Sequence, residues 1–176
     1  GDSVSYSYDW YVDGALVSET SATLSGTDNF DKGQLVAVIV TPDDGTDTGS
    51  SATSSTITVS NTLPVISDLT LSPDPVGTDD TLQATPTATD ADGDTLTYSW
   101  SWEVSGTVSS ETTDELDGSS EFDKGDTIIA TAIPHDGEDS GDAFSSDSIT
   151  VGNAPPELTS VTLSPSAVYT DDAVTA

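Results

Sequence analysis

The chain has 176 residues, of which 32 are acidic and two are basic, so its formal net charge is −30. This charge repels phosphates, which argues against nucleic acid as a partner and against an anionic membrane surface. Hydrophobic residues still make up 33% of the chain, and their regular spacing indicates a folded protein rather than a disordered polyelectrolyte. Adaptation of the surface to high salt is a second interpretation of the acidity.

The sequence repeats itself at an offset of 92 residues without a gap. Residues 1–10 return as 93–102, and the Phe-Asp-Lys-Gly sequence of 30–33 returns at 122–125. A period of this size is one domain, and arrays of one domain commonly serve reach, display or assembly. We therefore expect a slice of a longer tandem array, with a partial module over 1–60, a complete module over 61–152 and the start of a third over 153–176.

Alternating apolar and polar residues predict strands in chain order, beginning with 4–12 in the first module. No segment shows helical periodicity. About seven strands within one 92-residue period predict an all-β fold of tandem antiparallel immunoglobulin-like β-sandwich modules. In the complete module the expected strands are 66–72, 81–89, 95–104, 107–110, 115–122, 127–134 and 144–151, with the weakest patterns at 107–110 and 115–122.

Tryptophans recur on one face of the strands at 4–12 and 95–104. Trp10, Trp100 and Trp102 alternate with polar residues, so we interpret them as core residues, with sugar stacking as the alternative. Trp100 is placed on the buried face of its strand.

Residues 88–98, Ala-Thr-Asp-Ala-Asp-Gly-Asp-Thr-Leu-Thr-Tyr, resemble the second and third strands of bacterial and archaeal cadherin-like and PKD-like Ig-fold repeats of large surface proteins. The sequences at 122–126, 135–137 and 149–155 also suit such repeats. The resemblance implies an extracellular protein, secreted or attached to the cell surface. In cadherins, calcium lies at module junctions beside a D-x-D pair, which Asp90 and Asp92 match. The linker at 59–64 lacks the aspartates of a cadherin linker.

Topology leads to the same junction. In a seven-stranded sandwich, the loops at 90–94 and 136–139 lie at the pole where the linker enters, so their six carboxylates, Glu138 included, should gather near Asn61. Calcium takes six to eight hard oxygen ligands and suits such a cluster better than magnesium. The alternative is that Asp-Gly-Asp is only a favourable turn. The predicted calcium ligands are Asp90, Asp92, Asp94, Asp136, Asp139 and Asn61.

The two lysines, Lys32 and Lys124, occupy equivalent positions one period apart. Their loop lies at the opposite pole and faces the next module. We expect each lysine to form a weak salt bridge across a junction. An isopeptide crosslink and a solvated lysine are the alternatives.

Few residues suit catalysis, because the chain has one histidine, His135, and neither cysteine nor arginine. We therefore predict a protein that is not an enzyme: a repetitive extracellular stalk or filament segment without membrane insertion, whose partners are neighbouring copies of itself, head to tail. One alternative is an adhesin module that binds carbohydrate or a protein ligand, with Tyr11 as the best exposed aromatic. Another is an accessory module of an extracellular enzyme.

The two ends of the chain are complementary. Residues 1–60 lack the first two strands of their module, and residues 153–176 encode the first strand and the beginning of the second. In a continuous array the neighbouring sequence supplies the missing strands; between separate chains, the tail of one copy would complete the head of the next. Both hypotheses place residues 153–176 beside residues 1–60 of an adjacent copy, or leave both ends poorly ordered.

Overall fold

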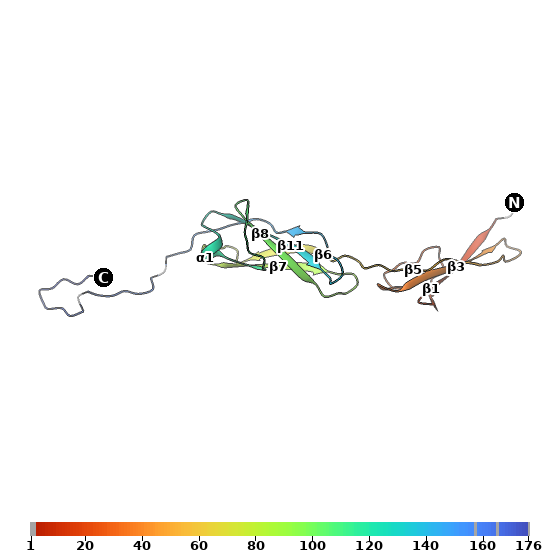
Figure 1. The fold of residues 1–176 in the computed structure, drawn as a ribbon, viewed down its shortest axis with the longest axis horizontal. Coiled ribbons are helices and arrows are strands. Elements are labelled where there is room, and N and C mark those ends of the chain that lie inside the picture. Colours follow the sequence, from red (N-terminus) through yellow and green to blue (C-terminus); the bar gives the residue numbers. More distant parts are fainter. Residues whose placement is uncertain (1–2, 157, 165, 176) are drawn as a thin grey trace.

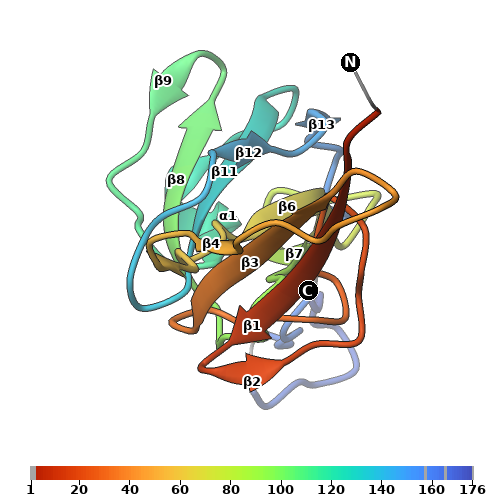
Figure 2. The ribbon, with the colours of Figure 1, turned by 90° about the vertical axis from the view of Figure 1, so that its right-hand side faces the viewer.

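The computed structural model describes residues 3–156, 158–164 and 166–175, and antiparallel strands dominate it (Figure 1). The first five strands form one sheet in the order β2-β1-β3-β4, with β5 also paired to β3. We call it the N-terminal sheet; Figure 2 shows it from the N-terminal side. Its strands are β1 (Ser5–Val12), β2 (Ala15–Leu16), β3 (Leu35–Asp43), β4 (Ala52–Thr53) and β5 (Ile57–Thr58).

The elements β6 to β13 form two further sheets, and together we call them the middle unit. One sheet has the order β10-β7-β6 and the other the order β12-β11-β8-β9, with β13 also paired to β11. The predicted all-β, antiparallel character is confirmed. The elements are β6 (Val65–Ser72), β7 (Thr81–Thr89), β8 (Thr97–Val104), β9 (Thr107–Val108), β10 (Glu115–Asp117), α1 (Gly118–Glu121), β11 (Thr127–His135), β12 (Phe144–Ser145) and β13 (Ile149–Thr150).

Both sheets of the middle unit contribute to one apolar core around Trp102, which is 1% exposed. Trp102 lies opposite Ala130 in the register of β8 with β11, so a small residue leaves room for the large ring. Its indole N–H donates to the carbonyl of Thr113 at 2.9 Å, which satisfies the one polar atom of the buried side chain.

Trp100 faces the core as predicted, but it is only partly buried. It packs against the edge of the core and lies 5.7 Å from Tyr98 between ring centroids. The fully buried tryptophan of this strand is Trp102, two residues further along.

Several expected strands are shorter than predicted: the one at 107–110 spans only Thr107–Val108, the one at 95–104 begins at Thr97, and two others are interrupted. The segment at 115–122 leaves its sheet after Asp117, whose side chain accepts from the backbone N–H of Ser119 at 3.0 Å and begins the single turn of α1. Gly118 is required there because a Cβ would lie 2.5 Å from the carbonyl oxygen of Asp80. The segment at 144–151 divides into β12 and β13, which pair with different parts of β11.

The N-terminal sheet has the pairing of its counterpart in the middle unit. Every partner pair of β1 with β3 returns in β8 with β11 with 92 added to both numbers, as in Trp10 with Val38 and Trp102 with Ala130. Among the described residues no second sheet covers it. Its inner face is therefore partly exposed, and only Val12 and Val36 are buried hydrophobic residues there.

Residues 153–175, which we call the C-terminal segment, contain no named strand among the residues described. One isolated antiparallel bridge joins Ser164 to Thr175. Ser72 and Gln83, the residues 92 positions earlier, are partners in the pairing of β6 with β7. The two ends of the chain lie at opposite ends of the long axis (Figure 1), so the C-terminal segment does not cover the N-terminal sheet of its own chain. Positions 157, 165 and 176 of the expected third module lie outside the described residues.

The short helix α1 is the one helix in the part of the chain that the structure describes, and no helix there has the length and apolar character needed to cross a bilayer.

Trp10 and Trp102 are equivalent residues one period apart, and their difference in burial gives a test of this architecture. Replacing Trp102 by alanine should destabilise the middle unit by about 3–5 kcal/mol, the usual cost of a large-to-small change in a core. Trp10→Ala should cost the N-terminal sheet much less, because Trp10 is only partly buried. The measurement is denaturant unfolding of the full chain followed by amide NMR signals of each part. Ser101→Ala, on the exposed face of β8, is the control; an equal effect of Trp102→Ala and Ser101→Ala would refute the assigned core.

Candidate functional site at the junction

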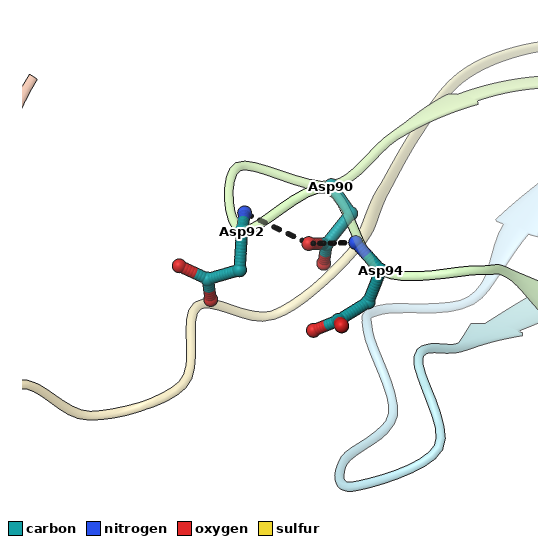
Figure 3. Close-up of side chains that lie close together, drawn as sticks. All are labelled: Asp90, Asp92 and Asp94. Atoms are coloured by element: carbon teal, nitrogen blue, oxygen red, sulfur yellow. Dashed lines mark hydrogen bonds between the residues drawn. The ribbon is translucent and has the colours of Figure 1, made fainter. Parts of the chain in front are cut away.

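The loop that follows β7 folds around the side chain of Asp90. One carboxylate oxygen of Asp90 accepts from the backbone N–H of Asp92 at 2.9 Å and from that of Asp94 at 3.2 Å (Figure 3). Gly93, with φ of +79°, allows the tight bend between them. Asp90, Asp92 and Asp94 each present a carboxylate oxygen within 4.8 Å of the other two. Carboxylates this close repel each other unless donors or cations lie among them.

The loop that follows β11 is organised in the same way by Asp136, which is 8% exposed. Its Oδ1 accepts from the backbone N–H groups of Glu138 at 2.8 Å and Asp139 at 2.7 Å. Its Oδ2 accepts from the side-chain amide of Asn61 at 2.7 Å. Donation by Asn61, followed by the backbone donors, lowers the pKa of Asp136 from its ordinary value of 3.8 to about 2.

The linker joins the two loops through consecutive residues. Asn61 Nδ2 reaches Asp139 Oδ2 at 3.3 Å in addition to Asp136. The backbone N–H of Thr62 donates to Asp92 Oδ2 at 2.7 Å. The structure therefore brings the linker and both acidic loops together, where topology placed them. We call this region, residues 59–64 with 90–94 and 136–139, the junction.

Two oxygens at the junction are buried from solvent and have no hydrogen-bond partner: Oδ1 of Asn61 and Oδ2 of Asp90. An unsatisfied buried acceptor costs about 1–3 kcal/mol or more. Both atoms are hard oxygen donors, one an amide and one a carboxylate, which are ligand types that calcium and magnesium accept. The donor set at the junction therefore fits a hard divalent cation.

Lys32 reaches the junction from the N-terminal sheet side. Its Nζ lies 2.5 Å from Asp94 Oδ2 and 2.9 Å from Glu138 Oε1. The hydrogen bond to Asp94, then that to Glu138, raises the pKa of Lys32 above its ordinary value of 10.5. The predicted salt bridge across the junction is confirmed for Lys32. Lys124 instead donates to Asn153 Oδ1 at 3.3 Å, and among the described residues it forms no ion pair.

The sequence predicted a bridge from Lys32 to carboxylates across the junction but did not identify its partners, which are Asp94 and Glu138, one from each acidic loop. The 92-residue period contained this information, because it places Lys32 at the far pole of one module and Asp94 at the near pole of the next. The backbone donor of Thr62 had no signal in the sequence, since every residue except proline carries the same N–H group.

His135 directly precedes Asp136. Its ring nitrogens contact Ser99 Oγ at 2.8 Å and Ser140 Oγ at 2.7 Å, and both partners are neutral hydroxyls.

The chain matches no protein-family model and no curated protein.

The low pKa of Asp136 gives a pH-dependent test of the link between linker and loop. A carboxyl whose pKa is lowered by folding stabilises the fold above its unfolded pKa of about 3.9, and that contribution is lost as pH falls through about 2. In metal-free buffer, Asn61→Ala should raise the pKa of Asp136 toward 3.8, as measured by carboxyl NMR titration. The difference in melting temperature between wild type and variant should narrow between about pH 4 and pH 2.

Asn153→Ala is the matched control, because Asn153 is the counterpart of Asn61 one period later and contacts Lys124 instead. It should leave the titration of Asp136 unchanged. An unshifted Asp136 in Asn61→Ala would contradict the assigned contact.

Proposed function

We propose that this chain is part of a tandem array of immunoglobulin-like β-sandwich modules with a 92-residue period, and that the array is an extracellular stalk or filament, secreted or attached to the cell surface. The observation that carries the proposal is the junction, where Lys32, the linker and two acidic loops meet. Specific contacts concentrated where one module meets the next are what a stalk requires. The two parts follow each other along the long axis (Figure 1), which also suits reach.

The strand order supports the immunoglobulin-like assignment. In that fold the first, second and fifth strands share one sheet and the third, sixth and seventh share the other. In the middle unit β6, β7 and β10 share a sheet, and β8, β11, β12 and β13 share the other. This is the order of the fold except at the fourth strand, which belongs to the first of these sheets in that fold, whereas β9 lies at the edge of the second sheet beside β8. The boundaries that follow for the modules are 1–60, 61–152 and 153–176.

Lys32 alone is too weak to make the junction stiff. Glu138, one of its two partners, is 59% exposed, and water and salt screen such an ion pair. Lys32 also supplies one positive charge to a group of six carboxylates. The contacts of Asn61 and Thr62 tie the linker to the middle unit, but they add no positive charge.

Calcium supplies the missing charge in this proposal. Asp90, Asp92 and Asp94, whose carboxylate oxygens lie within 4.8 Å of one another, would hold it together with Asp136, Asp139 and Asn61. The ion would offset repulsion among the carboxylates while satisfying the unpartnered oxygens of Asn61 and Asp90. Calcium is preferred to magnesium because it accepts six to eight oxygens in flexible geometry, whereas magnesium requires a strict octahedron and retains water.

Direct ligand binding by the sheet faces has less support. Tyr11, the aromatic residue suggested for an adhesin surface, is partly buried on β1 and pairs with Ala37 and Leu16. An array with its specific contacts at the poles therefore remains the preferred function.

Calcium binding is tested with Asp90→Asn in the full chain. The variant keeps the Oδ1 acceptor that ties the loop together and replaces the unpartnered Oδ2 by an amide. Calorimetric titration of the wild type should show saturable calcium binding and a higher melting temperature. The variant should lose at least the roughly 10- to 100-fold in affinity that removal of an outer-shell partner costs.

Asp44→Asn provides the matched control. Asp44 is the counterpart of Asp136 in the N-terminal part and accepts from Thr46 and Asp47 in the same way, but among the described residues no linker asparagine donates to it. Its calcium affinity should equal that of the wild type. Metal-insensitive melting of the wild type, or equal affinities in Asp90→Asn and wild type, would remove calcium from the proposal.

The stalk itself is tested by electron microscopy of the native material. We expect thin beaded fibres outside the cell, with one bead per 92-residue period, and greater curvature after chelation of calcium. Discrete compact particles would rule out a stalk or filament.

A further inference from the structure

One carboxylate at the junction belongs both to the candidate calcium site and to the salt bridge. Asp94 presents an oxygen within 4.8 Å of oxygens of Asp90 and Asp92 (Figure 3), and we call these three residues the acidic triad. Asp94 Oδ2 also lies 2.5 Å from the Nζ of Lys32. The ammonium group is therefore in direct contact with one of the three carboxylates that the ion would use. An ammonium group and a metal ion on the same carboxylate repel each other.

The second carboxylate that binds Lys32 lies outside the acidic triad. Glu138 Oε1 is 2.9 Å from Nζ, and Glu138 is also absent from the predicted calcium ligands. Its backbone N–H donates to Asp136 Oδ1 at 2.8 Å, so the loop is held without the help of its side chain. That side chain is 59% exposed and is free to follow the ammonium group. Lys32 is thus bound by one carboxylate that the ion needs and by one that it does not need.

We infer that Lys32 occupies part of the calcium site while the ion is absent, and that calcium displaces its ammonium group from Asp94 and leaves it on Glu138. This inference rests on the calcium site proposed above and adds how that site is regulated. The exchange is a competition between two cations for one carboxylate. A single residue of one module thereby sets the calcium affinity of the next module.

The lysine and the carboxylates come from different parts of the chain. Lys32 lies between β2 and β3 of the N-terminal sheet, whereas Asp94 and Glu138 lie in two loops of the middle unit. Both salt bridges among the described residues belong to Lys32 and join these two parts. The contact between the parts and the occupancy of the calcium site are therefore coupled through one side chain.

The unpartnered oxygens explain why calcium would replace the ammonium group at Asp94. Lys32 Nζ donates to Asp94 and Glu138, but Asn61 Oδ1 and Asp90 Oδ2 stay buried without a partner. The lysine therefore leaves the cost of two unsatisfied acceptors in place. Calcium carries two charges and accepts six to eight oxygens, so it can contact the acidic triad and both unpartnered oxygens together.

The charge of the junction explains why the lysine would stay nearby. The two acidic loops carry six carboxylates, which outnumber the three positive charges of calcium and Lys32 together. After the exchange Glu138 still has no other cation among the described residues, so its attraction for the ammonium group persists. The two parts are then joined by two salt bridges in the metal-free state and by one in the calcium-bound state.

Calorimetric titration of the full chain with calcium tests the competition. Lys32→Met keeps a long unbranched side chain and removes the charge. Its calcium affinity should be about tenfold higher than that of the wild type, because a unit charge a few ångström from a divalent ion opposes binding by that order even in water. High salt should narrow the difference. Lys124→Met is the matched control, since Lys124 is the counterpart one period later and forms no ion pair among the described residues; its affinity should equal that of the wild type.

The movement of the lysine is followed by NMR of the side-chain Nζ groups, which is simple because the chain has two lysines. In chelator the ammonium protons of Lys32 should exchange slowly with water, since they are bound to two carboxylates. Calcium should shift the Lys32 signal and speed the exchange without making it equal to that of a solvated lysine. In Glu138→Gln, calcium should release Lys32 fully. Glu103→Gln, on the exposed face of β8, should behave as the wild type does.

The outcomes separate this inference from the calcium site itself. A calcium affinity of Lys32→Met that equals or falls below that of the wild type would overturn the competition and leave calcium binding intact. A Lys32 signal that calcium does not change would do the same. Equal exchange rates of Lys32 in calcium-loaded wild type and Glu138→Gln would overturn its retention on Glu138. Absence of calcium binding in both wild type and Lys32→Met would reject the calcium site, and the inference with it.

Discussion

Repulsion among carboxylates is the constraint around which the junction is organised. Two loops of the middle unit end at the same pole and each carries three acidic residues, so the pole is stable only if donors or cations separate their charges. Backbone N–H groups of the loops hold one oxygen each of Asp90 and Asp136, and the linker and Lys32 contact the carboxylates that remain. The linker and the lysine thus place donors and one cation beside these carboxylates.

The alternation of apolar and polar residues was sufficient to predict most of the fold, because a half-buried strand imposes a period of two on its sequence. It failed at 115–122, where Gly118 is placed by the carbonyl of Asp80, a partner 38 positions away that local patterns do not encode. It also did not distinguish Trp100 from Trp102. Both face inward, but only Trp102 is fully buried, and alternation gives the two residues the same pattern.

The candidate site was predictable to the level of loops and not of atoms. The strand order of the fold places the acidic loops beside Asn61, and this placement does not depend on the conformations of the side chains. The contact of Thr62 with Asp92 and the unpartnered oxygens of Asn61 and Asp90 depend on backbone direction and burial, which emerge only when the chain is folded. Glu138 illustrates the difference: it belongs to the predicted cluster, but in the structure its carboxylate pairs with Lys32.

The single lysine at the junction has a consequence for how such an array responds to its surroundings. Lys32 is the one fixed cation among the described residues there, and it balances a minority of the charge. The remaining negative charge is balanced by dissolved ions. The stiffness of the junction therefore depends on the ions in the medium as well as on the sequence. In the proposed array, with one such joint per period, a change in the ionic composition of the medium would stiffen or relax the array along its whole length without any change in its covalent structure.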